Sequence, residues 1–492
     1  MHGSRATRRD VQSDIAVRER TARGARPGSP AHRRGGGRGQ GLPYNSVMLW
    51  PRCHAAPHAG SALRLRRRYR RQAGRFPGWS PAGPACGRRT PDPGMNERID
   101  ATTDRPGTAA RTGTGTMPND GAAADLSART ALPARLPGLD LLRVVAVLAV
   151  IAFHWLFRGP VTGVSGPVRF PGLEAVAVYG YFGVDLFFTL SGFVIAWSAE
   201  GRDAIGFARA RLLRLWPTFA VSVSLTAAVL AWAADPALPV TAAQWLANLT
   251  FLPHLFGQRF VDSAYWSIVT ELVFYGWVFL ALATGLWRRH PALLGWGWLA
   301  LSAINLKLGN VAFDRLVLAS FAGEFLAGIL LYRLRVDGPS AGRLAMLAAA
   351  MAVQVAHGMV NAADLTTQYG VVPDLRVVAL LHLAVFALVA LAVPLSTGPA
   401  AARLARTAGL MTYPAYLLHQ NIGAVALARL TAAGIDPIAA LAVAGAALLA
   451  ASWLIAAFIE PAGRRLLAAL ADPLIARLPG RRPGQASAGT TV

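Results

Sequence analysis

The sequence predicts an all-α membrane protein, a polytopic bundle of about ten transmembrane helices with both termini inside the cell. Hydrophobic residues make up 54% of the chain and charged residues only 15%, which is typical of proteins that cross a bilayer many times. Ten apolar stretches are long enough to span it as helices, near residues 139–157, 175–198, 215–234, 264–286, 291–307, 312–332, 342–360, 377–396, 408–428 and 438–459.

The basic charge of the chain is concentrated before the first span. Residues 1–94 hold 20 arginines against four acidic residues, and they are rich in glycine and proline. This composition predicts disorder for residues 1–134. The arginine-rich run at 64–71 would suit a nucleic-acid arm, but a start codon assigned too far upstream gives the same composition. We favour the second interpretation, with Met95 as the start, and expect no nucleic-acid partner.

The loop charges predict the orientation, because short loops that keep arginine and lysine are usually cytoplasmic. With the N-terminus inside, the inner loops and the C-terminal tail hold sixteen arginines, whereas the outer loops hold seven basic residues. We therefore expect a membrane domain at 135–465, a disordered cytoplasmic tail at 466–492, and a multi-pass location in the inner (plasma) membrane.

The first span carries Arg143 and His154 on one face. Eleven positions separate them, which at about 100° per residue returns to nearly the same direction, about 16 Å further along the axis. Ionisable groups at membrane depth usually face a bundle interior or a water-filled cavity, so the pair predicts a functional site. The alternative is that Arg143 anchors the helix at the interface and His154 is an ordinary buried residue.

The second span places Asp185 among aromatic side chains. A carboxylate in hydrocarbon is costly, so we expect it to meet Arg143 or His154, as a structural or a catalytic partner. Arg211 and Arg214 follow on the inner side, three residues apart. They either fix the topology or bind a phosphate-bearing donor, since guanidinium groups suit phosphate oxygens.

The fourth span begins with Tyr265, Trp266 and Ser267, and Glu271 follows one turn after the serine. Glu271 is expected to orient His154 or to bind an acceptor hydroxyl, unless local hydroxyls simply satisfy its carboxyl. In the ninth span, His419 lies in TYPAYLLHQNIG. Most of the remaining polar residues are interpreted as structural, namely Glu324, His357 and His382. No metal site is expected in the membrane domain, which contains no cysteine.

Several stretches in order resemble the acyltransferase 3 family of membrane acyltransferases. They are Arg143 to His154 with ten residues between, FGVDLFFTLSGFVI at 182–195, RLLR at 211–214, WSIVTELVFY at 266–275, TYPAYLLH at 412–419 and IEP at 459–461. The resemblance covers roughly residues 135–465. One departure is Glu271-Leu272, where the family usually has a glutamate doublet.

The resemblance implies transfer of an acyl group, commonly acetyl from acetyl-CoA, to a hydroxyl of a sugar, glycan, lipid-linked or secondary-metabolite acceptor at the outer side. By position, Arg143 and His154 are the family's arginine–histidine pair, and Arg211 and Arg214 would hold the CoA phosphates. The partners expected are thus acyl-CoA, the acceptor and membrane lipids.

In the mechanism expected from these residues, His154 is the general base and Arg143 stabilises the oxyanion or the departing thiolate. Asp185 or Glu271 would select the histidine tautomer, and a covalent acyl-histidine is an alternative. The residues expected to bind the acceptor are Tyr265, Trp266, Ser267 and His419. A transporter or flippase with intramembrane charges is the competing class; the inner arginine pair, the absence of an internal repeat and the ordered motifs favour the enzyme.

Overall fold

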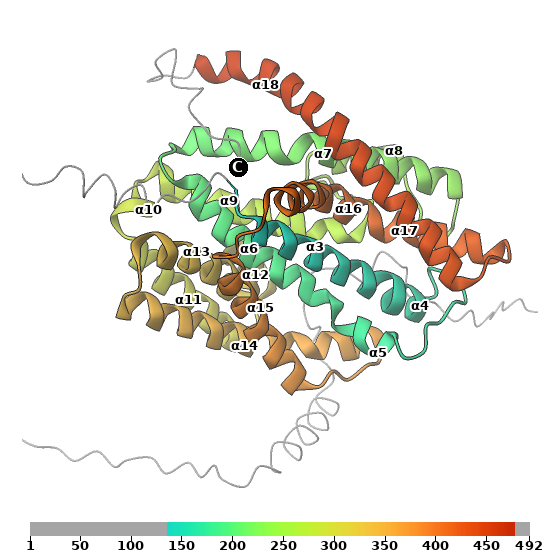
Figure 1. Ribbon diagram of the computed structural model, residues 1–492, viewed down its shortest axis with the longest axis horizontal. Helices are drawn as coiled ribbons and strands as arrows, with labels where there is room; N and C mark the ends of the chain where they lie inside the picture. Colours follow the sequence, from blue (N-terminus) through green and yellow to red (C-terminus); the bar gives the residue numbers. More distant parts are fainter. Residues whose placement is uncertain (1–134, 478–492) are drawn as a thin grey trace, which may run out of the picture. The chain divides into compact units, whose positions relative to one another are not determined.

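The computed structural model describes residues 135–477, and every regular element in this part of the chain is a helix (Figure 1). The predictions for residues 1–134, including the start at Met95, and for residues 478–492 lie outside the described residues. Each of the ten predicted spans coincides with one helix or with two or three consecutive helices.

The first half of the domain runs from the first predicted span to the fifth. Its helices are α3 (Pro137–Ala152), η2 (Phe153–Arg158), α4 (Gly159–Thr162), α5 (Glu174–Ala177), η3 (Val178–Tyr181), α6 (Phe182–Ala199), α7 (Ala204–Ala233), α8 (Ala242–Asn248), η4 (Pro253–Phe256), η5 (Ser263–Tyr265), α9 (Trp266–Ala283), α10 (Leu286–Arg289) and α11 (Pro291–Leu308).

The second half contains the remaining spans and one further helix at the end. Its helices are α12 (Val311–Val317), η6 (Ala319–Phe321), α13 (Ala322–Asp337), α14 (Ala341–Tyr369), α15 (Leu375–Ala392), α16 (Pro399–Ala432), α17 (Pro437–Leu454), η7 (Ile455–Ile459) and α18 (Glu460–Ala476).

Seven helical segments of the described residues are long and apolar enough to cross a membrane, or eight if α12 and the following η6–α13 segment, bent by 55°, form one span. The predicted spans that fall outside this group are α11 and α16. In α16 the polar side chains His419, Gln420 and Asn421 lower the hydropathy, yet all three are buried. The number of ten spans and the inward orientation of the termini therefore remain predictions.

The structure differs from the prediction for the C-terminal tail over its first residues. Helix α18 continues to Ala476, so residues 466–476, predicted as disordered, are helical. An ion pair ties this helix to the bundle, since Asp472 contacts Arg209 of α7 at 2.5 Å. The composition of this segment resembles a tail, but an amphipathic helix of this kind is stabilised by the surface on which it packs.

Helix α6 lies in the middle of the bundle and packs against α3, α13 and α15. Its contact with α13 is close because glycines lie at the crossing. A Cβ on Gly192 would lie 2.1 Å from the carbonyl oxygen of Phe325, and one on Gly328 would lie 2.0 Å from that of Thr189. Small residues allow helix backbones to approach in membranes, where packing drives association.

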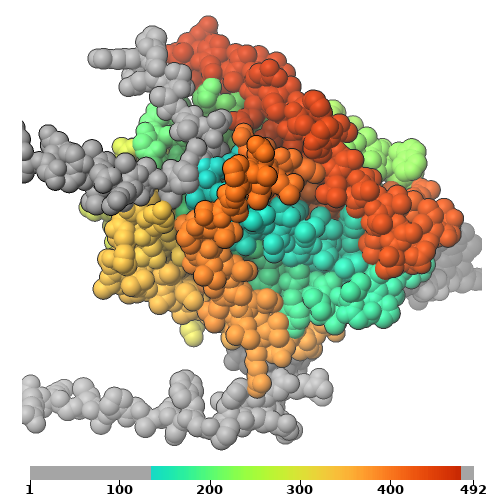
Figure 2. Space-filling view, viewed as in Figure 1, coloured from blue at the N-terminus to red at the C-terminus, as the bar shows by residue number. Residues whose placement is uncertain are grey.

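Helix α16 packs against both α3 and α17, and α3 and α16 supply residues to the site described below. Figure 2 shows α16 in orange against α3 in teal, with α17 in red along its other side.

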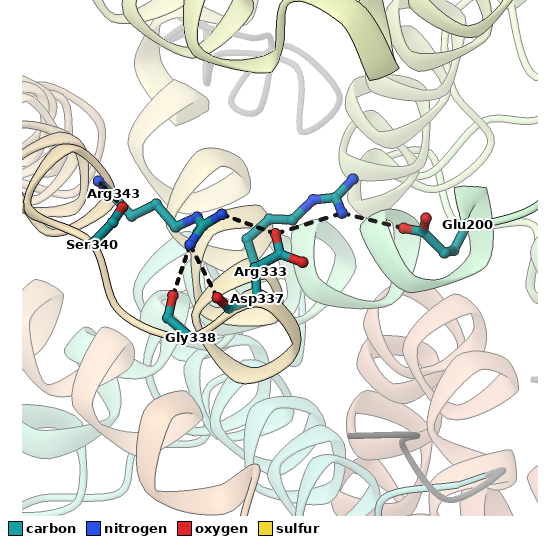
Figure 3. Close-up of polar contacts among 6 residues, drawn as sticks. All are labelled: Glu200, Arg333, Asp337, Gly338, Ser340 and Arg343. Carbon is teal, nitrogen blue, oxygen red and sulfur yellow. Dashed lines mark hydrogen bonds and ion pairs between the residues drawn. The ribbon is translucent and has the colours of Figure 1, made fainter. Parts of the chain in front are cut away.

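A polar network closes one end of α6 and α13. Arg333 of α13 contacts Glu200, just after α6, at 3.3 Å, while Arg343 at the start of α14 contacts Asp337 at 3.2 Å (Figure 3). The backbone N–H of Arg343 also donates to the Ser340 hydroxyl, which caps α14. Charged networks of this kind favour the interface over the hydrocarbon, so they mark where these helices leave the membrane.

Candidate active site

A basic cavity of about 780 Å³ lies among α3, α6, α7, α9, α16 and α18. Seven arginines line it against two acidic residues, Glu271 and Glu460. The arginines are Arg135, Arg143, Arg211, Arg214, Arg406, Arg464 and Arg465. They come from the beginnings of α3, α7 and α16 and from the beginning of α18, the ends predicted to be cytoplasmic. Such a cavity suits a polyanionic ligand.

Arg143 lines this cavity while remaining paired. Its guanidinium donates to Asp140 at 2.7 Å, and Arg135 donates to the other oxygen of the same carboxylate at 2.9 Å. Asp140 itself is buried. This carboxylate therefore fixes the direction of both arginines at the cavity wall, one helical turn inside α3.

The predicted pair Arg211 and Arg214 also lies at the cavity. Arg214 is paired with Glu460 at 2.7 Å, whereas Arg211 is buried and forms no ion pair with the described residues. The neighbouring Arg209 points elsewhere, since it binds Asp472 of α18 and does not line the cavity. Among the cavity arginines, Arg211 is thus the buried one without an ion pair to the described residues.

Glu271 lies in the cavity wall, but its partners are hydroxyl groups. The hydroxyl of Ser191 donates to it at 2.7 Å, and the hydroxyl of Tyr275 donates to the same oxygen. No contact joins it to His154 in the described part of the chain. The expectation that Glu271 orients His154 is therefore not met, because local hydroxyls satisfy the carboxylate.

His154 meets a second histidine deep in the bundle. It lies in the π-helical turn η2, and such turns often occur at functional sites. Its Nδ1 lies 2.9 Å from the carbonyl oxygen of Val150 and 3.1 Å from Nε2 of His419, and Nδ1 of His419 lies 2.6 Å from the carbonyl oxygen of Tyr416.

These contacts assign the tautomers. A carbonyl oxygen only accepts, so Nδ1 of His419 carries the proton, and its Nε2 is an acceptor. Nδ1 of His154 then carries a proton too, shared between Val150 and His419. The second ring nitrogen of His154, Nε2, is buried and has no hydrogen-bond partner among residues 135–477. An imidazole in this state presents an unshared lone pair, as a general base requires.

Two side chains connect the cavity to the histidine pair. The hydroxyls of Ser267 and Tyr416 lie 2.7 Å apart, and both residues line the cavity. The ring centroid of Tyr416 lies 5.4 Å from that of His419. The sequence missed Tyr416 as a site residue, although it lies in the quoted TYPAYLLH stretch one turn before His419.

Asp185 lies away from His154 and Arg143, contrary to the expectation from its burial. Its carboxylate lies together with Glu324 of α13 and His382 of α15. Asp185 meets Glu324 because the glycine contacts bring α13 close against α6. His419 takes the position beside His154 that Asp185 was expected to take.

Of the four residues expected to bind the acceptor, only Ser267 lines the cavity. Tyr265 is completely buried, and its hydroxyl contacts Thr226 and the carbonyl oxygen of Leu417 at 3.2 Å each. Trp266 packs its ring against phenylalanines of α6 and η6. His419 is also fully buried, and its contact is to His154.

Asp262, a residue that sequence reasoning overlooked, anchors the long loop before α9 to Asn421 of α16. Its carboxylate accepts from the backbone N–H groups of Ala264 at 2.9 Å and Asn421 at 2.8 Å. Burial raises the pKa of Asp262 to about 6, although both N–H groups favour the charged form. The sequence did offer a signal for Asp262. It directly precedes the helical turn Ser263–Tyr265, and aspartate is a preferred N-cap.

The helical bundle and its basic cavity define a class, that of multi-pass membrane proteins with an arginine-lined cavity next to a buried histidine pair. A family model described as an acyltransferase domain matches residues 136–457, and the chain belongs to this family, acyltransferase 3. The predicted resemblance is thereby confirmed over nearly the expected range.

Among curated proteins, acyltransferase MdmB of Streptomyces mycarofaciens is 29% identical over 172 residues. The match covers 32% of this chain and 40% of that relative, so the chain spans about two fifths of the relative's length. No solved structure shows a significant match.

Proposed function

We propose that this protein is an integral membrane O-acyltransferase that moves an acyl group, acetyl being the first candidate, from cytoplasmic acyl-CoA to a hydroxyl of a sugar, glycan, lipid-linked or secondary-metabolite acceptor at the outer side. The inner (plasma) membrane is its proposed location. The observation that carries the proposal is the polarity of the site, with seven arginines around the cavity and the unshared nitrogen of His154 deeper in the bundle.

The donor would bind first through its phosphates. Arg211 supplies a guanidinium without an ion pair to the described residues, and Arg143 lies in the same wall. Because about 16 Å of helix axis separates Arg143 from His154, Arg143 suits the phosphates better than the oxyanion role expected from the sequence. The extended arm of the donor then carries the thioester toward Ser267 and Tyr416.

The chemical step is assigned to His154. Its Nε2 takes the proton of the acceptor hydroxyl while the hydroxyl oxygen attacks the thioester carbonyl, and the bond between that carbonyl and sulfur breaks to release the CoA thiolate. His419 fixes the tautomer and accepts from the Nδ1 that gains positive character, a role of positioning. The family membership favours this enzyme over the transporter or flippase considered from the sequence.

His154→Gln tests the assignment. Membranes that carry the wild type or the variant are incubated with radiolabelled acetyl-CoA, and label is followed into glycan, lipid and small-molecule fractions. We expect transfer to fall by about 10²- to 10⁴-fold, the usual contribution of a general base. The matched control is His357→Gln, because His357 is another buried membrane histidine, bonded to Ser302 away from the cavity. Retained transfer in His154→Gln would refute the base assignment.

A further inference from the structure

A second polar cluster lies in the bundle outside the cavity. It consists of Asp185 on α6, Glu324 on α13 and His382 on α15, and one ligand atom of each lies within 4.8 Å of the others. Their exposed fractions are 6%, 0% and 3%. The three residues are far apart in the sequence, and only the packing of the three helices brings them together.

Several polar atoms of the cluster lack a well-aligned hydrogen bond. Both carboxylate oxygens of Glu324 and Nδ1 of His382 are buried without a well-aligned hydrogen bond among residues 135–477, although the side chains of Asp185 and Gln354 lie beside Glu324. Two carboxyls and an imidazole at membrane depth are costly unless a counter-charge or hydrogen bonds compensate them. On one side the surroundings are apolar, since the ring of Phe182 packs on His382 with centroids 4.7 Å apart.

The packing also holds the imidazole in place. Nε2 of His382 faces Gly358, where a Cβ would lie only 1.9 Å from that nitrogen. Glycine at this position leaves the space that the ring occupies, and Nδ1 is left on the side of Glu324. The direction of the nitrogen toward the carboxylate is thus set by the fold.

The distances suit two ligands of one metal ion. Nδ1 of His382 and Oε1 of Glu324 lie 3.5 Å apart, which is too long for a good hydrogen bond. Two donors at the bond lengths of zinc, arranged tetrahedrally, are about 3.3–3.6 Å apart. A proton shared by the two carboxyls would satisfy one oxygen of each and leave the imidazole nitrogen unpartnered, whereas one divalent cation contacts all three groups and cancels both negative charges.

We propose that Asp185, Glu324 and His382 bind a divalent transition-metal ion of the zinc class, which ties α6, α13 and α15 together inside the membrane. Imidazole nitrogen combined with carboxylate oxygens favours zinc over magnesium or calcium, which prefer oxygen ligands alone. This inference departs from the expectations from the sequence that the domain has no metal site and that most of its remaining polar residues are structural.

The experiment measures metal in the full-length protein. The chain is produced with added zinc, purified in detergent and washed with a chelator, and its metal content is determined by mass spectrometry. We expect about one zinc per chain, since a buried structural site releases its ion slowly. A wild type that retains less than about a tenth of an equivalent would overturn the proposal.

X-ray absorption spectroscopy at the zinc edge then identifies the ligands. The measurement uses the wild type, so it does not depend on whether a variant folds. The proposed site gives oxygen and nitrogen at about 2.0–2.2 Å, whereas a site on Cys53 or Cys86 gives sulfur at about 2.3 Å. A sulfur shell as the main signal would place the ion elsewhere and contradict the proposal.

The variants Glu324→Gln and His382→Gln keep the size of the side chain and remove one ligand each. We expect either to lower bound zinc by at least about tenfold, consistent with loss of a direct ligand. His357→Gln is the matched control and should keep its zinc, because it removes a buried histidine outside the cluster. Equal zinc in monodisperse wild type and Glu324→Gln would overturn the assignment.

Discussion

Nδ1 of His154 and Nε2 of His419 lie 3.1 Å apart, although 264 residues separate the histidine of η2 from that of α16. The ring centroids are 4.8 Å apart at 72°, so the rings meet edge to face. This geometry orients the proposed base by a neutral imidazole, where hydrolase triads use a carboxylate.

His419→Leu should lower kcat by about 10- to 100-fold and leave the KM for acyl-CoA nearly unchanged, because it removes an orienting partner and no donor contact. The loss should be smaller than in His154→Gln, since the carbonyl oxygen of Val150 still accepts from Nδ1 of His154. His419→Gln, whose amide oxygen reaches the place of the lost nitrogen, should recover part of the rate. A main effect on KM would instead place His419 at the donor.

Arg211→Ala should raise the KM for acyl-CoA by about 10- to 100-fold with a minor change in kcat, because a charge-assisted phosphate contact is worth about 1.5–3 kcal/mol. Arg209→Ala is the control. It removes an arginine from the same helix, but one that is bound to Asp472 and does not line the cavity. Steady-state kinetics on purified protein separates the two, and equal KM values for both variants would move the donor site elsewhere.

Asp262→Asn should flatten the dependence of stability on pH. The pKa of Asp262 is about 6 in the fold, against an ordinary value of 3.8 for aspartate, so the folded state binds this proton first as the pH falls. The carboxyl therefore adds stability below the folded pKa, and that stability is lost as the pH rises through 6. Between about pH 7.5 and about pH 5, this group should contribute about 1 kcal/mol in the wild type.

Thermal unfolding in detergent at the two pH values measures this contribution. The other titrating groups are common to both proteins, so the difference between wild type and Asp262→Asn isolates Asp262. Identical pH dependence in the two proteins would show that Asp262 does not titrate in this range.

Gly192→Ala should destabilise the protein by about 1–3 kcal/mol, the usual cost of overpacking. The added Cβ would meet the carbonyl oxygen of Phe325 at 2.1 Å, and a backbone atom has little freedom to move. Gly276→Ala is the control, since a Cβ there has no atom within 4 Å. Thermal unfolding should leave the control unchanged or slightly more stable, because alanine favours a helix over glycine. Equal stability of the two variants would contradict the tight contact.

The helices were predictable to a large extent, because membrane spans need long apolar stretches whatever their neighbours are. The same reasoning missed α18 beyond residue 465, where an ion pair between Arg209 and Asp472 and the underlying surface stabilise a helix with a tail-like composition. It also assigned a span to α16, which is not among the helices apolar enough to cross a membrane and which carries the buried polar residues His419 and Asn421.

The sequence by itself determined the family and the helix face that carries Arg143 and His154. The ordered motifs identify the family, and the period of the helix places Arg143 and His154 on one face. Only the tertiary structure decided the partners. His419 rather than Asp185 meets His154, and Asp185 joins Glu324 and His382, because the closeness of two helices depends on glycines and side chains on both surfaces. Periodicity along one helix gives the direction of a side chain, but the neighbour it meets is a property of packing between helices distant in sequence.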